Sequence, residues 1–211
     1  MNIQTLPLQI GRDLSFTTNC YIVSATKNAT EVVVIDPADK VEQILAAIRN
    51  RKVAAILLTH RHDDHTGAAG ELVAATKALV YAHEQDRQAI EQPQGRYPFY
   101  SHERRNPPKV SKLLAEGDIV CAAGLNLKVL HTPGHSAGSI CFYSDVEKIL
   151  FSGDTLFCGT CGRTDFASGS PAAMHDSLQR LSKLPPDTKV LPGHDSATTI
   201  GAELNRGLSE Y

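Results

Sequence analysis

The sequence predicts an α/β fold in which two similar halves pack sheet to sheet, with helices on the outside. Short β-branched runs alternate with segments of helical periodicity, in the order β-β-β-α-β-α-β before a long loop and in a related order after it. Apolar residues make up 42% of the 211 residues and charged residues 21%, as in a globular chain with a sizeable core. We therefore expect a single domain over residues 1–211.

The predicted strands are runs of about three to seven residues, rich in Val, Ile, Leu and Thr and bounded by Gly, Pro, Asn, Asp or Ser. They are Cys20–Ser24, Glu31–Asp36, Val53–Thr59, Ala78–Ala82, Leu125–His131, Ser139–Ser144, Lys148–Ser152 and Lys189–Leu191.

Two helices have recognisable starts. Asp39, with Glu42 three residues later, forms a capping-box pattern that predicts a helix to about Asn50. Ser170 followed by Pro171 predicts another, because proline is favoured in the first helical turn. Met174, Leu178 and Leu181 lie on one face of that second helix, and two prolines end it.

Residues 91–112, "EQPQGRYPFYSHERRNPPKVSK", contain four prolines and three aromatic residues in an irregular pattern. Such a segment is typical of a linker or of an insertion loop. Because strand patterns continue on both sides, we expect an insertion loop that covers a site.

Charge and composition exclude several classes of partner. The net charge is −2 and the basic cluster at 104–112 is short, so we expect no nucleic-acid partner. No apolar run approaches the roughly 18 residues of a membrane span, and the N-terminus lacks the pattern of a signal peptide. The odd number of scattered cysteines predicts reduced thiols and a cytoplasmic location. These are Cys20, Cys121, Cys141, Cys158 and Cys161.

The stretch "AAILLTHRHDDHTGAAG" places three histidines and two aspartates directly after a predicted buried strand. Further possible ligands follow later strands: His135, Asp154 and His194, each directly after a glycine. Functional side chains are often found at the ends of strands. The loops there can vary in sequence while the sheet fixes the positions at which they begin and end. The common placement of these possible ligands therefore predicts one metal site.

The number of candidates indicates more than one ion. Structural zinc takes four ligands and catalytic zinc leaves a position open, so seven ligands suit two ions that share a carboxylate. The candidates are His60, His62, Asp64, His65, His135, Asp154 and His194.

The motifs "THRHDDH", "HTPGHSAGS", "FSGDTLF" and "LPGH" resemble those of the metallo-β-lactamase fold, in its single-domain, glyoxalase II-like (hydroxyacylglutathione hydrolase-like) branch. The resemblance covers residues 18–207 and implies a four-layer αββα sandwich with the metal site along one edge. It implies two divalent metal ions, with zinc favoured and iron or manganese as alternatives. By this resemblance the first ion is held by His60, His62 and His135, the second by Asp64, His65 and His194, and Asp154 bridges both. Asp36 would support the site from behind.

The implied activity is metal-dependent hydrolysis. Metal-bound hydroxide, oriented by Asp64 and Asp154 as catalytic residues, would attack a carbonyl group. A thioester suits this chemistry because its leaving thiol has a pKa of about 8.5 and needs no strong acid. The substrate class is an acylated glutathione-like thiol, or an acyl group on a carrier protein or coenzyme A. Arg163, in "CGRTDF", would contact an anionic substrate group or form a structural salt bridge, while Asp165 replaces an aromatic residue of the two-domain enzymes.

Two other hypotheses remain. "GRTDF" also resembles persulfide dioxygenases, which would use one ferrous ion held by His60, His135 and Asp154 or a similar subset. The third hypothesis is a metal-binding or partner-binding protein without catalysis, which the complete ligand set disfavours.

Overall fold

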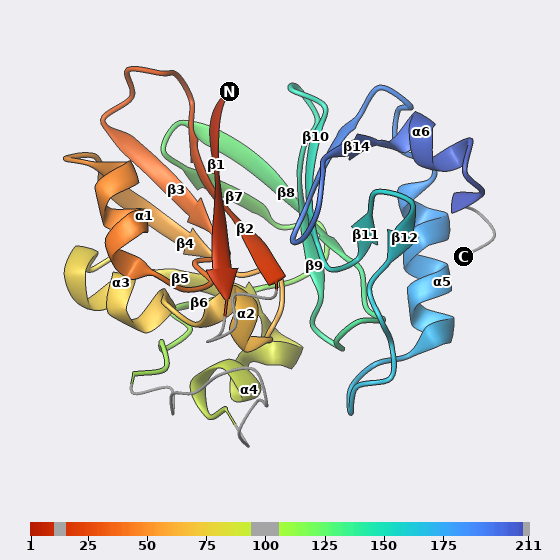
Figure 1. The fold of residues 1–211 in the computed structure, drawn as a ribbon, viewed down its shortest axis with the longest axis horizontal. Coiled ribbons are helices and arrows are strands. Elements are labelled where there is room, and N and C mark those ends of the chain that lie inside the picture. The colour runs from red at the N-terminus through yellow and green to blue at the C-terminus, as the bar shows by residue number, and fades with distance from the viewer. Residues whose placement is uncertain (11–15, 94–105, 209–211) are drawn as a thin grey trace.

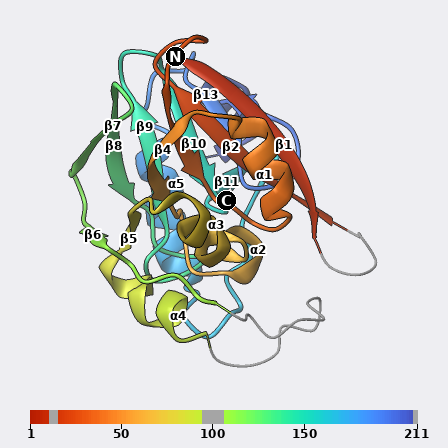
Figure 2. The same ribbon diagram turned by 90° about the vertical axis from the view of Figure 1, so that its left-hand side faces the viewer.

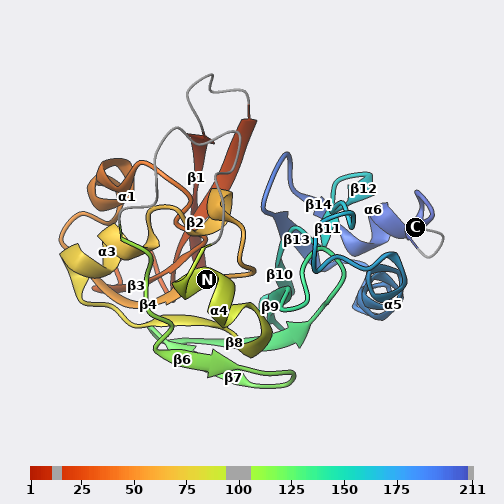
Figure 3. The same cartoon turned by 90° about the horizontal axis from the view of Figure 1, so that it is seen from below.

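The computed structural model describes residues 1–10, 16–93 and 106–208. Two sheets lie face to face between helices (Figures 1 and 3). Helices α1 (Val41–Ile48) and α3 (Ala69–Thr76) cover the outer face of the first sheet, which Figure 2 views from the side of these helices. Helices α5 (Pro171–Leu181) and α6 (Ile200–Leu204) cover the second. This is the four-layer αββα sandwich that the sequence predicts.

In the described residues each sheet has six strands and takes them from one half of the chain. The first sheet is antiparallel from β1 to β3 and parallel from β3 to β6. Its strands, in spatial order, are β1 (Asn2–Ile10), β2 (Phe16–Ser24), β3 (Glu31–Ile35), β4 (Lys52–Leu57), β5 (Val80–His83) and β6 (Lys112–Leu114).

The second sheet is antiparallel except for the β10–β13 pair. Its strands, in spatial order, are β14 (Thr198–Thr199), β13 (Lys189–Pro192), β10 (Ile149–Gly153), β9 (Ile140–Ser144), β8 (Leu125–His131) and β7 (Ile119–Ala122). The shorter elements are α2 (Asp63–Thr66), the 3-10 helix η1 (Glu84–Asp86), α4 (Arg87–Glu91) and the hairpin of β11 (Leu156–Phe157) and β12 (Thr160–Cys161).

The unbroken apolar run of β3 is explained by burial on both faces. Val32 and Val34 pack toward α1 and α3, whereas Val33 and Ile35 pack between the two sheets. Successive side chains of a strand point to opposite faces, so a central strand with both faces covered needs an apolar residue at every position. The space between the sheets is thus a core shared by both halves of the chain.

A third core lies between the second sheet and α5. Met174, Leu178 and Leu181 are buried there, which confirms the predicted apolar face of this helix. The predicted start is also confirmed, because Ser170 Oγ accepts a hydrogen bond from the Ala173 backbone N–H at 3.2 Å.

The predicted capping box at Asp39 is wrong. The N-cap of α1 is Lys40, whose φ of 53° is left-handed, and no side chain caps the helix. The Asp39 Oδ1 atom instead accepts a hydrogen bond from the adjacent Lys40 N–H at 2.7 Å. The helix ends at Ile48, two residues before the predicted end.

All eight predicted strands are present, but the strands β1, β6, β7, β11, β12 and β14 were not predicted. The longest of these is β1, at the edge of the first sheet. In this edge strand only Leu8 and Ile10 are fully buried, and Pro7 interrupts the pattern. Proline is tolerated at a sheet edge, where it removes no ladder hydrogen bond. The weak apolar signal of β1 therefore reflects its half-exposed position.

Within the predicted insertion loop at 91–112, α4 ends at Glu91 and β6 begins at Lys112. Residues 94–105 lie outside the described residues, and with them the prediction that the loop covers a site. All five cysteines are free thiols. In the described parts of the chain, no helix is long and apolar enough to cross a membrane.

Candidate metal centre

The structure brings the seven predicted ligand side chains to one place. They lie on the segments that follow β4, β8, β10 and β13. Three overlapping groups each place their ligand atoms within 4.8 Å of one another. The groups are His60, His62 and His135; His60, His65 and Asp154; and Asp64, His65 and His194.

One side of this cluster consists of three buried histidines. His60 and His62 lie between β4 and α2, and His135 approaches from the second sheet. The His62 Nδ1 and His135 Nε2 atoms are 2.8 Å apart. Neutral imidazoles at this separation can donate electron pairs to one ion.

The other side combines imidazoles with carboxylates. The His65 Nε2 atom lies 3.2 Å from Asp154 Oδ1, and the His194 Nε2 atom lies 3.3 Å from Asp64 Oδ2 and 3.4 Å from Asp154 Oδ2. Asp154 also approaches His135, at 3.4 Å from its Nε2 atom, so its carboxylate lies between the two sides. The side chains of Asp64 and His194 are 20% and 19% exposed, so the cluster opens to solvent on their side.

Hydrogen bonds outside the cluster orient the rings. His135 Nδ1–H donates to the Arg163 carbonyl at 2.7 Å, and His194 Nδ1–H donates to the Thr17 carbonyl at 2.8 Å. Such a bond fixes both the ring orientation and the tautomer. Both rings consequently present Nε2 to the centre of the cluster.

A buried carboxylate orients two more rings. Asp36 Oδ2 accepts hydrogen bonds from His65 Nδ1–H at 2.9 Å and from the Thr59 hydroxyl at 2.7 Å. Because that hydroxyl donates to Asp36, its oxygen is left to accept from His60 Nδ1–H at 3.1 Å. The predicted supporting contact of Asp36 is therefore present, and Thr59, which sequence reasoning missed, extends it to His60.

Glycines make the approach of the loops possible. A Cβ atom on Gly193 would lie 2.4 Å from Asp154 Oδ1 and 2.5 Å from His65 Cε1. On Gly153, whose φ is 49°, it would lie 2.4 Å from Thr59 Oγ1. These separations are shorter than van der Waals contact, so a larger residue at either position would displace the cluster or its support.

Burial and charge divide the cluster into two protonation environments. Burial, followed by the charge of neighbouring imidazoles, holds the pKa of His60 well below its usual value and lowers that of His62 to about 3. Burial also lowers the pKa of His194, but the Asp154 and Asp64 carboxylates outweigh it and raise the pKa to about 10. An ion that binds among the carboxylates therefore has to displace protons, whereas His60 and His62 are already neutral.

The residues present fit a metal ion. The His60 Nε2 atom is buried and makes no hydrogen bond within the described residues, although it faces the other candidate ligands. A buried polar atom without a partner is costly and calls for an explanation. Mixed imidazole and carboxylate donors are suited to zinc, iron or manganese. A divalent ion would supply the missing partner.

Next to the cluster lies a cleft of about 370 Å³ with a partly apolar lining. The ring of Phe166, which sequence reasoning did not single out, packs 4.7 Å from the ring of His62 and 5.5 Å from that of His135. The lining residues are Arg61, His62, Asp63, Ala89, Pro93, Phe166 and Ala167.

The structure places Arg163 beside this cleft and gives its side chain two partners. Its guanidinium lies 4.6 Å above the ring of Phe166. It also forms a bidentate ion pair with Asp165, with N–O distances of 2.6 and 2.5 Å. Asp165, which replaces an aromatic residue of the two-domain enzymes, therefore binds Arg163, the residue predicted to contact substrate.

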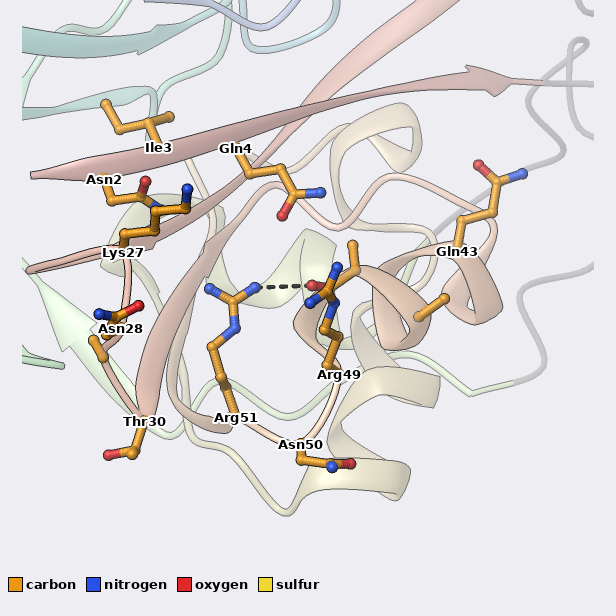
Figure 4. A pocket seen from close by; sticks show the side chains of 13 residues that line it. Asn2, Ile3, Gln4, Lys27, Asn28, Thr30, Gln43, Arg49, Asn50 and Arg51 are labelled. Atoms are coloured by element: carbon orange, nitrogen blue, oxygen red, sulfur yellow. Dashed lines mark hydrogen bonds between the residues drawn. The ribbon is translucent and has the colours of Figure 1, made fainter.

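A second concavity carries no predicted ligand (Figure 4). Lys27, Arg49 and Arg51 give it a basic lining. The Arg51 side chain is explained by helix capping, because it donates to the Ala47 and Ile48 carbonyls at 2.8 and 3.0 Å. These carbonyls end α1 and lack partners within the helix.

Comparison with known proteins places the chain among metalloenzymes. The family model described as the metallo-beta-lactamase superfamily matches residues 15–194. The hydroxyacylglutathione hydrolase GloC of Haemophilus influenzae is 33% identical over 214 aligned positions, covering 96% of this chain and 95% of the relative.

Solved structures are also similar. The B3 metallo-beta-lactamase BLEG-1 has a TM-score of 0.84 at 30% identity and covers all of both chains. TTHA1623, solved in a di-iron-bound form, has a TM-score of 0.77 at 36% identity and covers 95% of this chain and 98% of its own.

Proposed function

The chain belongs to the metallo-beta-lactamase superfamily, and from this premise we propose that it is a metal-dependent hydrolase of thioesters. The observation that carries the proposal is the convergence of all seven candidate side chains, with the Nδ1 atoms of four histidines bonded away from the centre. A relative named hydroxyacylglutathione hydrolase, similar over nearly its whole length, supports the hydrolase class.

In this proposal the two sides of the cluster hold different ions. His60, His62 and His135 hold one, Asp64, His65 and His194 hold the other, and Asp154 is shared. The di-iron form of a similar structure supports two ions and keeps iron beside zinc and manganese as the native metal. Bound divalent ions supply an activated water molecule and polarise a carbonyl group.

The chain's own residues position the reactants. Asp154 is 8% exposed and lies between both sides, whereas Asp64 lies at the side of the cluster that is open to solvent. Asp64 and Asp154 are the carboxylates proposed to orient the attacking water. The ring of Phe166 and the neighbouring cleft offer an apolar surface directly beside His62.

A thioester is the proposed substrate because its thiol leaves without a strong acid. The acyl group would be carried by a glutathione-like thiol, by coenzyme A or by a carrier protein. Arg163 is proposed to contact an anionic group of this carrier. To do so, its guanidinium would leave the ion pair with Asp165.

The alternative is a dioxygenase with one ferrous ion, which the stretch "GRTDF" supports. Metal content distinguishes the two. The protein is purified without added metal or chelator, its zinc, iron and manganese are quantified, and hydrolysis of an S-acyl glutathione, an acyl coenzyme A and a β-lactam is measured. His60→Ala serves as the inactive variant and Cys121→Ser, at an exposed thiol, as the matched control.

We expect about two metal ions per chain and hydrolysis of a thioester. The substitution His60→Ala should abolish this hydrolysis. One iron per chain without hydrolysis would favour the dioxygenase. Hydrolysis of the β-lactam alone would overturn the thioester proposal.

A further inference from the structure

We propose that Asp86 is a positioning residue: it ties the turn that carries His135, in the second sheet, to the first sheet and keeps it in register with the loop that carries His60 and His62. The proposal rests on the proposed function, since it assigns these loops to metal binding. Asp86 ends η1, after β5, and is 1% exposed. It is absent from the candidate ligands and from the motifs that predict the site.

The first contacts of Asp86 are with the loop that carries His135. Its Oδ2 atom accepts a hydrogen bond from the Ser136 hydroxyl at 2.6 Å, and its Oδ1 atom accepts one from the Gly138 N–H at 3.0 Å. Ser136 directly follows His135. One carboxylate thus spans this turn with both oxygens.

The element that carries Asp86 is joined to the loop that carries His60 and His62. Asp86 follows β5, which pairs with β4, and the Leu58 N–H at the end of β4 donates to the Tyr81 carbonyl of β5 at 3.0 Å. Burial raises the pKa of Asp86, while the hydrogen bonds from Ser136 and Gly138 and the charge of the nearby Arg61 lower it. Arg61 stands between His60 and His62 in the chain. Asp86 consequently ties the turn of the second sheet to the first sheet, in register with this loop.

Gly138 lies in close contact with Asp86. A Cβ atom at this position would lie 2.6 Å from Asp86 Cγ and 2.7 Å from its Cβ and backbone N. Real Cβ atoms do not approach so closely, so any side chain here would displace Asp86. The approach of the carboxylate to the turn therefore depends on glycine.

The turn is also held between these two contacts. The Ala137 carbonyl accepts a hydrogen bond from His131 Nε2–H at 2.9 Å, and the His131 ring stacks on His83 with centroids 4.0 Å apart. Three consecutive residues after His135 are thus bonded to side chains outside the turn. A buried carboxylate is costly unless hydrogen-bonded, and here its bonds go to the turn that carries His135.

The test compares Asp86 with a buried carboxylate elsewhere. Glu203 is fully buried and accepts hydrogen bonds from Gly159 N–H at 2.8 Å and Thr198 Oγ1 at 2.5 Å, so Glu203→Gln is the matched control. Zinc affinity of the full chain is measured by competition with a chromophoric chelator. Amide hydrogen exchange at residues 60–62 and 135–139 is measured on the metal-free protein.

Asp86→Ala is expected to weaken zinc binding by about 10- to 100-fold, as is typical for loss of a group that orients metal ligands. It should speed exchange in both loops. Asp86→Asn, which keeps one accepting oxygen, should give an intermediate loss. Gly138→Ala should reproduce the loss with the carboxylate still present, and it carries the test if Asp86→Ala does not fold.

Unchanged zinc affinity and exchange in Asp86→Ala and Gly138→Ala would overturn the inference, as would an equal loss in Glu203→Gln. If the unaltered protein binds no zinc, iron or manganese, the proposed function fails. The exchange measurement then decides the role of Asp86 by itself.

Discussion

The Asp36 carboxylate accepts a hydrogen bond from His65 Nδ1 at 2.9 Å, although 29 positions separate the two residues in the chain. Both are almost fully buried. The same oxygen accepts from Thr59, whose hydroxyl lies beside His60. One carboxylate at the end of β3 thereby sets the direction of two imidazoles from the next loop.

Replacement of Asp36 by Ala should weaken metal binding by about 10- to 100-fold, because His65 loses the partner that fixes its tautomer and the Thr59 hydroxyl, which bonds His60, loses the acceptor that orients it. Affinity is measured by chelator competition. The control is Asp39→Ala, which removes a partly exposed carboxylate that bonds only its own neighbour's N–H among the hydrogen bonds of the described residues. Equal affinities of the two variants would contradict the assigned role of Asp36.

Gly193→Ala should strip the metal from the site, because the new Cβ atom would lie 2.4 Å from Asp154 Oδ1. Metal content after purification checks this. Gly117→Ala is the control, since Gly117 has a φ of 84° but a Cβ atom there would meet no heavy atom of the described residues within 4 Å. That control should lower the free energy of unfolding by about 1–2 kcal/mol and keep its metal. A full metal content in Gly193→Ala would show that the cluster tolerates displacement.

His194→Ala and Asp154→Ala should differ in stoichiometry if the proposed sharing is right. His194 contacts Asp64 and His65 on the carboxylate side, besides the shared Asp154, so its loss should remove one ion. Asp154 lies between both sides, so its loss should weaken both ions. Metal content measured after dialysis against a weak chelator distinguishes the variants. Identical stoichiometry in both would argue against a shared carboxylate.

Asp165→Asn should release Arg163 for substrate. An exposed ion pair contributes little, so KM for an S-acyl glutathione should fall by about two- to fivefold while kcat stays unchanged. An uncharged thioester is the control substrate and should show no change. A KM that stays the same for both substrates would separate Arg163 from substrate recognition.

His83 should make stability sensitive to acid. Burial, and then the neighbouring His131, lower its pKa to about 4 from the usual 6.5. Above pH 6.5 the ring is neutral in the folded and unfolded chains, so it has no effect on stability. Between pH 6.5 and 4 only the unfolded chain takes up the proton, so the free energy of unfolding falls over this window.

In the unaltered protein the Gln85 N–H donates a hydrogen bond to His83 Nδ1 at 3.3 Å. The variant His83→Asn removes the titrating imidazole and keeps a side-chain acceptor for this N–H. The melting temperatures of the metal-free proteins are measured from pH 7.5 to 4. The unaltered protein should lose more stability than the variant as the pH falls. Parallel curves would show that the two chains titrate alike.

The amino-acid sequence by itself determined the fold class and the candidate ligands. The unbroken apolar run Val32–Ile35 places apolar side chains on both faces of its strand. Such a run is required only in a sheet that is covered on both sides. Candidate ligands such as His135 and Asp154 are readable because each follows a strand and a glycine, both of which are local signals. The half-exposed β1 and the N-terminus of α1 were missed because their local signals are weak or misleading.

The tertiary structure alone decided how the ligands are held. No local pattern in a single sequence predicts three of the observed contacts. These are the hydrogen bonds of Asp36 with His65 and of Asp86 with Ser136, and the ion pair of Arg163 with Asp165. The first two join residues that are far apart in the chain, and the third depends on the turn that Arg163 and Asp165 share. Hydrogen-bond geometry is set by the packing of loops against one another, to within tenths of an ångström, whereas periodicity records only which face of an element is buried.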